Sequence, residues 1–439
     1  MHILSKSTYI KGEQCTKALY LFKNRPFLRD KLSLEKIAKF RRGTDVGILA
    51  QQCFPGGVNM TPKSPALFDK MVKETMENIS NPDVNVMYEA VFQYDDTLIM
   101  LDIIVRDGDK WRAIEVKSSL SLSPTYYKDA ALQYYVLKGS GVPVSDIQLM
   151  YINKDYIKNG DLDLTQLFVF QSVKDFAEQY HDVIAENIRS FKEAIAQPHS
   201  PKIEVGRQCD LPYRCEFHGH CWKDVPEDSE LYTEGLTDEQ IDAVRQKTYC
   251  IDYKSLFDLL GERDRPTAFL NLLFYSPAVP IFDGDKPYTE FIIGFSILSN
   301  NGSFDRIYNW NCLDDLSGWK DSLKLLREQL AGFERVVCFA PQNITASLQK
   351  FSIMDSKDIN FKILNFRDIL RESHFYHEKV KHDFSLKNVY ESLHPEKTLF
   401  EHSRIILNAF SSTEKSMVTR DMELENKALR DVYRHFCHQ

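Results

Sequence analysis

Three carboxylates in the stretch 88–117 have the spacing to hold a metal ion, and one lysine lies close to them in sequence. They are Glu89, Asp102, Glu115 and Lys117. Asp102 and Glu115 stand inside otherwise apolar runs, where a charge is destabilising unless it is paired or bound to a metal. Acidic groups that face each other across strands also repel, so a bound cation that neutralises them is the simplest explanation. The alternative is that these charges only solvate an open sheet face; we prefer it for any one residue but not for the set.

The elements that must position these residues are three successive β-strands joined by short polar turns. Aromatic and β-branched residues dominate each run. The runs are VMYEAVFQY (86–94), TLIMLDIIVR (97–106) and KWRAIEVK (110–117), with turns at 95–96 and 107–108. Two-residue hairpin turns would place Glu89 opposite Asp102 and Asp102 opposite Ala113. Because side chains of one strand repeat every second residue, Glu115 and Lys117 then share a face with Asp102.

A helix that carries a glutamine follows the third run. Pro124 begins the predicted helix, Gly139 to Gly141 end it, and Gln133 lies in its segment DAALQYYVLK. With Asp102 and the tripeptide Glu115-Val116-Lys117, this order resembles the RecB-like group of PD-(D/E)XK nucleases, whose signature is Asp, a hairpin, Glu-x-Lys and a helix with Gln. The resemblance implies a restriction-endonuclease-like α/β core. In that family the acids hold Mg²⁺ or Mn²⁺, and the lysine helps to position or polarise the attacking water.

Cysteines form a second group of residues with possible chemistry. Cys209, Cys215 and Cys221 fall close together, although the nine cysteines of the chain average only about one per 49 residues. Thiolate groups at this density indicate a metal or cluster site. The segment STYIKGEQCTKALYL around Cys15 resembles the start of the iron–sulfur (CRISPR-associated exonuclease) subgroup of RecB-like nucleases. That resemblance implies that Cys15 and the three later cysteines hold a 4Fe–4S cluster.

The sequence does not decide whether this centre holds iron or zinc. Zinc held by the three later cysteines together with His218 or His220 is the alternative. The sequence also departs from the subgroup, whose commoner spacing has two of these cysteines closer together. In either case the centre would tie the first helix to the end of the nuclease-like domain and have a structural role.

Length and composition are those of an ordinary globular protein of two or three domains: 439 residues, 43% hydrophobic and 27% charged. The longest apolar runs are strand-length and the amino terminus lacks the apolar core of a signal peptide, so we expect a cytoplasmic protein with no membrane partner. The net charge is −8, yet residues 1–42 carry eleven Lys/Arg against three Asp/Glu, a local excess of 8. A basic segment beside an acidic metal site suits phosphodiester chemistry, whereas a solvated helical surface is the alternative.

The chain divides into two predicted domains. Residues 1–222 form the nuclease-like domain, and 223–265 form a polar, helical linker in which Thr237-x-x-Gln240 predicts a capping box. Residues 266–439 mix strands with helices, which is typical of an RNase H-like three-layer α/β domain. This part resembles the DnaQ-like domain that follows a RecB-like nuclease in a bacterial family of uncharacterised function.

In the DnaQ-like family the first strand of the domain carries the catalytic acids as Asp-x-Glu. The matching positions here are Asn271 and Leu273, and a neutral amide and an apolar side chain cannot hold two divalent cations. Asp368 and Asp431 could match further acidic positions, although two scattered carboxylates are more often surface charges. We therefore predict a degenerate domain that is used for binding or scaffolding.

Two functions from different classes follow. The first is a metal-dependent deoxyribonuclease in which Asp102 and Glu115, with Glu89, bind Mg²⁺ or Mn²⁺ while Lys117 orients the nucleophile. The second is a catalytically inert nucleic-acid-binding or assembly protein. These residues do not distinguish single- or double-stranded DNA from RNA. The chain has no P-loop motif GxxxxGK[ST], so unwinding would need a helicase or other protein partner.

Overall fold

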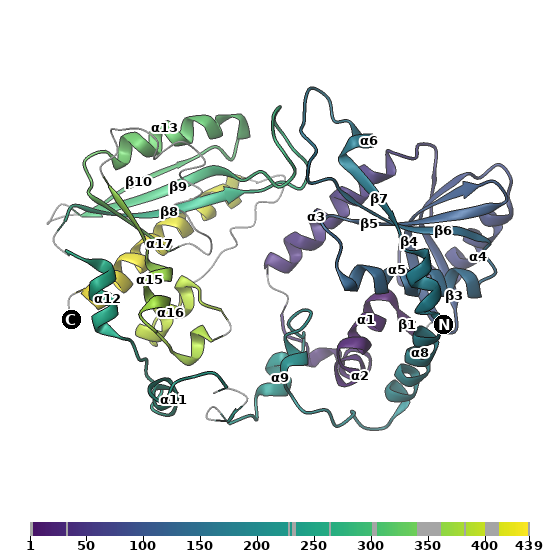
Figure 1. The fold of residues 1–439 in the computed structure, drawn as a ribbon, viewed down its shortest axis with the longest axis horizontal. Helices are drawn as coiled ribbons and strands as arrows, with labels where there is room; N and C mark the ends of the chain where they lie inside the picture. The colour runs from purple at the N-terminus through teal and green to yellow at the C-terminus, as the bar shows by residue number, and fades with distance from the viewer. Residues whose placement is uncertain are drawn as a thin grey trace. The chain divides into compact units, whose positions relative to one another are not determined.

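Two compact units make up the chain in the computed structural model, and each contains a mixed β-sheet with helices (Figure 1). The structure describes residues 3–31, 34–226, 229–230, 234–262, 265–300, 305–339, 361–381, 383–399 and 412–437. Unit 1 comprises Met1–Asp224 and Pro277–Thr289, and unit 2 comprises Val225–Ser276 and Glu290–Gln439. The predicted α/β class is confirmed.

Within the described residues, the sheet of unit 1 has seven strands in the order β2-β3-β4-β5-β6-β7, and β1 pairs with β4 outside this path. The strands are β1 (Leu4–Ser5), β2 (Val58–Asn59), β3 (Val86–Tyr94), β4 (Thr97–Asp107), β5 (Lys110–Lys117), β6 (Val144–Ile152) and β7 (Phe168–Ser172). β3, β4 and β5 form an antiparallel meander, whereas β5 and β6 are parallel. The first hairpin has the predicted register, because Tyr94 pairs with Thr97.

Helices cover both faces of this sheet (Figure 1). The helices of unit 1 are α1 (Lys6–Gln14), α2 (Thr16–Asn24), α3 (Leu34–Gln51), α4 (Phe68–Ser80), α5 (Pro124–Gly139), α6 (Leu164–Leu167), α7 (Lys174–Gln179), α8 (His181–Ala196) and α9 (His218–Trp222), with short 3₁₀ turns η1 (Pro26–Leu28), η2 (Pro65–Leu67) and η3 (Arg207–Cys209). Residues of α1, α2, α4, α5, α7 and α8 pack in one core, and residues of α3 pack in a second core on the other face. The helix predicted to begin at Pro124 is present.

The β3–β4 ladder is interrupted at Glu89 and Asp102. Glu89 has φ +52, a left-handed conformation that is uncommon for a residue other than glycine. Side chains on either side of this break face different cores: Leu101 packs in the core that contains α5, and Ile103 packs in the core that contains α3. The alternation of every second residue, which the sequence predicts along the whole strand, therefore changes phase at the two acids.

The second hairpin of the meander differs from the predicted register by two residues. Ala113 lies opposite Ile104 and not opposite Asp102. The turn is centred one residue later than predicted because Gly108, with φ +64, takes its first position, where the favoured hairpin turns need a positive φ. Continuing this register along the strands brings Glu115 opposite Asp102, so the correction draws two acids closer together than the prediction did.

The sheet of unit 2 has five strands among the described residues, in the order β10-β9-β8-β11-β12. They are β8 (Thr267–Tyr275), β9 (Phe291–Asn300), β10 (Asp305–Asn311), β11 (Arg335–Cys338) and β12 (Lys362–Asn365). β8, β9 and β10 are antiparallel, and β11 is parallel to both β8 and β12. The central strand β8 is therefore buried between two differently oriented neighbours.

Helices also cover both faces of the second sheet, which gives unit 2 three layers. The described helices are α11 (Asp238–Arg245), α12 (Tyr253–Leu260), α13 (Trp319–Leu330), α15 (Phe366–Glu372), α16 (Leu386–Leu393) and α17 (Ser412–Cys437), with 3₁₀ turns η4 (Leu316–Gly318) and η5 (Glu378–Val380). Residues of α13 pack on one face, and residues of α12, α15, α16 and α17 pack on the other. The predicted capping box of Thr237 and Gln240 is confirmed at the start of α11. No helix in the described parts of the chain is long and apolar enough to span a membrane.

Candidate active site and cysteine pocket

Glu115 is the centre of a buried cluster of charged side chains on the face of β5 that α5 covers. Its side chain is only 2% exposed. Its Oε1 accepts hydrogen bonds from Lys117 Nζ and Lys6 Nζ, each at 2.7 Å, and its Oε2 accepts one from Gln133 Nε2 at 2.7 Å. Burial alone would raise the pKa of Glu115, but the two ammonium groups outweigh burial and hold this pKa well below its usual range.

Lys117 is fixed by two carboxylates. In addition to Glu115, its Nζ contacts Asp129 Oδ2 at 2.7 Å, and it lies 4.9 Å from the centre of the Tyr126 ring. Burial lowers the pKa of Lys117, yet Glu115 and Asp129 raise it further than burial lowers it. The lysine therefore remains an ammonium ion with a fixed direction at neutral pH.

Asp102 and Glu89 are the two acids of the site that resist ionisation. Asp102 Oδ2 accepts a hydrogen bond from the backbone N–H of Val116 at 2.6 Å. Burial, and then the negative charge of Glu115, raise the pKa of Asp102 to about 8. The same two causes raise the pKa of Glu89. A cation close to these carboxylates would lower both pKa values and so favour their ionised forms.

The structure thus brings Asp102, Glu115, Lys117 and Gln133 together, with Glu89 close enough to sense the charge of Glu115. Gln133 is completely buried, and its Oε1 has no hydrogen-bond partner among the described residues. This amide oxygen and the nearby carboxylates are oxygen ligands, the type that Mg²⁺ and Mn²⁺ prefer.

Two residues of this cluster, Lys6 and Asp129, were missed by the sequence interpretation. Lys6 is the first residue of α1 and follows β1, whose pairing of Leu4 with Thr97 attaches the amino-terminal segment to β4. Asp129 lies on α5, four residues before Gln133 and therefore on the same side of that helix. The helical spacing could have identified Asp129. Nothing in the local pattern indicates the pairing of β1 with β4.

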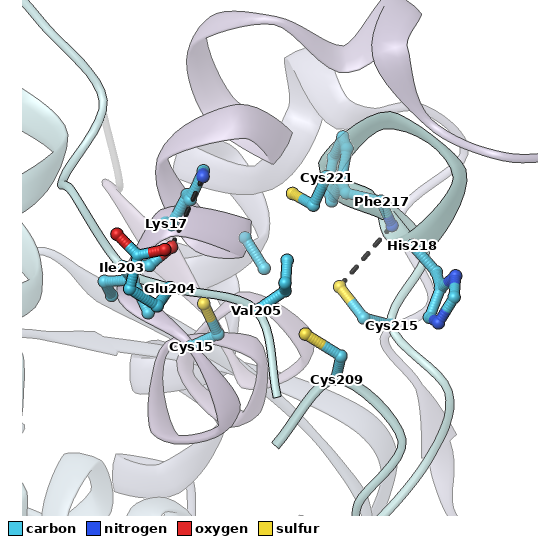
Figure 2. Close-up of a pocket in the computed structure, with 11 residues that line it drawn as sticks. Cys15, Lys17, Ile203, Glu204, Val205, Cys209, Cys215, Phe217, His218 and Cys221 are labelled. Carbon is cyan, nitrogen blue, oxygen red and sulfur yellow. Dashed lines mark hydrogen bonds between the residues drawn. The ribbon is translucent and has the colours of Figure 1, made fainter. Parts of the chain in front are cut away.

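Cys15, Cys209, Cys215 and Cys221 line one pocket of unit 1 (Figure 2). Cys15 separates α1 from α2, whereas the other three follow from η3 to α9. All four are free thiols, and the pocket holds about 340 Å³ of space not filled by atoms, part of it open to solvent. Burial raises the pKa of Cys215 to about 11. Four thiols around one space are of the donor type that iron–sulfur clusters and structural zinc sites both use.

The two histidines of the zinc alternative differ in position. His218 lines the pocket, but its ring is directed away from the sulfur atoms (Figure 2) and stacks on Trp222 with ring centres 4.9 Å apart. His220 is not one of the lining residues. The metal-binding side chains that face this pocket are therefore the four cysteines, and neither histidine is directed at them.

In the part of the chain that the structure describes, no group of three or more His, Cys, Asp or Glu side chains is arranged to hold a metal ion as it stands. At the carboxylate cluster, ammonium groups occupy one oxygen of Glu115. At the cysteine pocket, the thiols would have to lose their protons and approach each other. The carboxylates and the thiols are therefore chemically suitable metal ligands, and in both sites the side chains would have to move when a metal binds.

The region of unit 2 around Asn271 and Leu273 contains one acid that the sequence analysis did not select. Asn271 of β8 is buried, and its Nδ2 donates to Glu425 Oε2 of α17 at 2.6 Å. Leu273 belongs to the buried apolar residues. Asp368 accepts a hydrogen bond from Asn365 at 2.7 Å, and Asp431 pairs with Arg430 at 2.8 Å. The acid that lies against Asn271 is therefore Glu425.

A scan against protein-family models found no family that matches this sequence, and a search of curated proteins found no match either. The function of the chain is therefore inferred from the residues and geometry of its sites.

Proposed function

We propose that unit 1 is a metal-dependent nuclease that hydrolyses phosphodiester bonds of DNA at one site. The observation that carries this proposal is the arrangement around Glu115, a buried carboxylate that accepts hydrogen bonds from Lys117 and Gln133 and has Asp102 beside it. These are the residues through which the sequence resembles RecB-like PD-(D/E)XK nucleases. The break at Glu89 adds a third acid to the same cluster, at a backbone conformation of the kind that often marks functional sites.

Asp102 and Glu115, with Glu89, would hold Mg²⁺ or Mn²⁺. The bound ion supplies two things: a lower pKa for a coordinated water molecule, and positive charge against the phosphate as negative charge builds up on it. Lys117 keeps its proton because Glu115 and Asp129 both stabilise the ammonium ion. It therefore acts as a cation that orients the attacking water, and Gln133 fixes the direction of the Glu115 carboxylate.

The cysteine pocket would hold a 4Fe–4S cluster through Cys15, Cys209, Cys215 and Cys221, with zinc as the alternative metal. Its role in this proposal is structural. Gln14, next to Cys15, donates hydrogen bonds to the backbone carbonyls of Gln208 and Tyr213, at 3.0 and 2.6 Å. The amino-terminal helices and the cysteine-rich segment are thus already in contact, and a cluster would link them covalently.

Unit 2 is, in this proposal, a degenerate RNase H-like domain of the DnaQ type that is used for binding or scaffolding. Three antiparallel strands followed by two parallel ones, with helices on both faces, support this assignment. The Asn271–Glu425 pair supports the loss of its chemistry, because a neutral amide stands where a metal ligand would be needed. Any unwinding of duplex DNA would need a helicase or other protein partner.

The test is cleavage of labelled single-stranded DNA, double-stranded DNA and RNA with Mn²⁺ by the wild type and by Lys117→Ala. We expect the wild type to cleave DNA and the variant to lose this activity. Lys110→Ala removes an exposed lysine at the other end of the same strand and should cleave like the wild type. A wild type that cleaves none of the substrates would refute the proposal.

The second candidate is an inert nucleic-acid-binding or assembly protein. The observation that favours it is that ammonium groups, and not a metal-ready set of acids, surround Glu115 in the described structure. A Mn²⁺ titration separates the two candidates. Binding that disappears in Asp102→Ala supports the nuclease, whereas weak or absent binding that Asp102→Ala leaves unchanged supports the inert protein.

A further inference from the structure

Two lysines share one oxygen atom of Glu115, and only one of them belongs to the Glu-x-Lys motif. Lys117 Nζ and Lys6 Nζ each lie 2.7 Å from Glu115 Oε1. Gln133 Nε2 occupies Glu115 Oε2. Every oxygen of the carboxylate through which the proposed metal would bind is therefore already the acceptor of a short hydrogen bond.

The second lysine is held differently from the first. Lys117 is 12% exposed and has Asp129 as a further partner at 2.7 Å. Lys6 is 29% exposed, and in the described part of the chain it has no ion-pair partner besides Glu115. Loss of the contact with Glu115 would leave Lys117 anchored by Asp129, but it would free the whole side chain of Lys6. Of the two ammonium groups, Lys6 is the one that can leave.

The backbone that carries Lys6 is fixed, so any movement belongs to its side chain. Leu4 pairs with Thr97 of β4 and is completely buried. The backbone N–H of Ser5 donates to Thr8 Oγ1 at 2.7 Å, which ties the residue before α1 to its first turn. A lysine has a long, flexible stem with a compact charge at its end, and it can exchange partners without a change of the fold.

We infer that Lys6 is a built-in counter-ion that holds the metal-binding oxygen of Glu115 while the protein is free of metal, and that a divalent cation displaces it. This inference rests on the proposed function, because it concerns the same carboxylates. Lys6 is a positioning residue: it compensates the surplus of carboxylates and keeps Glu115 in place until a cation with two charges takes over. The ammonium and the metal compete for one site, so each weakens the binding of the other.

The first test is Mn²⁺ affinity, measured from the electron paramagnetic resonance signal of free Mn²⁺. We expect Lys6→Met to bind Mn²⁺ more tightly than the wild type, by at least about tenfold, because a competing cation is gone. Lys6→Arg keeps the charge and should retain the affinity of the wild type. Lys11→Met is the matched control, since it removes another Lys–Glu ion pair of α1, the contact with Glu216 at 3.0 Å. A lysine with a merely structural role would give the opposite sign, a weaker binding of Mn²⁺ in Lys6→Met.

The second test uses the wild type and does not depend on the folding of any variant. Lysines are acylated with a limiting reagent, and the modification of Lys6 is quantified by mass spectrometry with and without Mn²⁺. We expect Mn²⁺ to increase the labelling of Lys6 several-fold and to leave that of the exposed Lys110 unchanged. Equal labelling of Lys6 in both conditions would overturn the inference.

The two proposals fail in different ways. Absence of Mn²⁺ binding that depends on Asp102 overturns the proposed metal site together with the role of Lys6. Binding that depends on Asp102, but that Lys6→Met leaves unchanged or weakens, overturns the role of Lys6 alone.

Discussion

The two units bury polar side chains against their sheets in different ways. In unit 1, Glu115 forms ion pairs with the ammonium groups of Lys6 and Lys117, and the pKa of Asp102 beside it is raised. In unit 2, the amide of Asn271 donates to Glu425 at 2.6 Å, and the amide of Asn426 donates to the backbone carbonyl of Ser296 at 2.6 Å. One cluster is built from charges of both signs, and the other combines acids with neutral amides.

This difference is the basis for expecting a cation in the cluster of unit 1 and not in that of unit 2. An amide that donates to a carboxylate satisfies it without adding charge, and leaves no requirement for a metal. Several carboxylates close together cannot all ionise in a buried site unless positive charge is supplied. Unit 1 therefore combines the electrostatic cost of neighbouring carboxylates with a gain from metal binding, whereas the Asn271–Glu425 pair of unit 2 joins its carboxylate to a neutral donor.

The largest expected difference between the two units is in catalysis. Glu115→Gln should reduce DNA cleavage by about 100-fold or more, because the amide removes a metal-binding charge. The matched variant Glu425→Gln also changes a buried, amide-bonded carboxylate, and it should cleave like the wild type. Initial rates at saturating Mn²⁺ measure both. Equal losses in the two variants would contradict the assignment of catalysis to unit 1.

The iron content of the protein should depend on a cysteine of unit 1 and not on a cysteine of unit 2. Cys215→Ser is expected to remove most of the iron and visible absorbance from protein purified without oxygen, and to lower the free energy of unfolding by about 3 kcal/mol, because metal binding contributes to folding. Cys312→Ser, at a buried free cysteine of unit 2, should retain the iron. A colourless wild type that contains zinc would contradict the iron–sulfur assignment.

The amide cluster of unit 2 should matter for stability and not for activity. Asn271→Ala leaves the buried Glu425 without one of its donors and should lower the free energy of unfolding by about 2 kcal/mol in urea titrations. Asn271→Leu should be destabilised similarly, because it restores volume but no donor. Cleavage by the folded protein should be unchanged. A loss of cleavage in either variant at full folding would show that unit 2 takes part in the chemistry.

The last expected effect is a gain of stability. Asp102→Asn should abolish cleavage yet be more stable than the wild type in EDTA, and this gain should grow as the pH rises toward 8. The pKa of Asp102 is raised to about 8 in the folded protein, above that of an unfolded Asp. The contribution of Asp102 to stability is therefore lost as the pH rises from about 4 to about 8, and the variant lacks this loss. Thermal unfolding of both proteins across this range measures the difference, and a gap that does not widen with pH would contradict the account.

The sequence was sufficient for the strands that carry the site. Apolar runs with short polar turns predicted β3, β4 and β5, and the first hairpin has the predicted register. Gly108 shifted the second hairpin by two residues, since turn geometry, and not the apolar pattern, decides the register there. An even shift leaves the parity of side chains unchanged, so the prediction that Asp102 and Glu115 share a face did not depend on the exact turn.

Local sequence patterns could not predict two other features of the site. The left-handed conformation of Glu89 changes the phase of two strands, and a glutamate gives no sign of it in a sequence. Lys6 reaches Glu115 across 109 positions of the chain, through the parallel pairing of β1 with β4. Contacts of this kind arise from tertiary structure, which composition and periodicity do not specify.

The most direct test of the central claim is a Mn²⁺ titration of three proteins under one set of conditions: the wild type, Asp102→Ala and Glu425→Ala. The account predicts that the wild type and Glu425→Ala bind Mn²⁺ with the same affinity and that Asp102→Ala loses this binding. Binding that survives in Asp102→Ala, or that is lost in Glu425→Ala while the protein stays folded, would contradict the assignment of the metal site to unit 1.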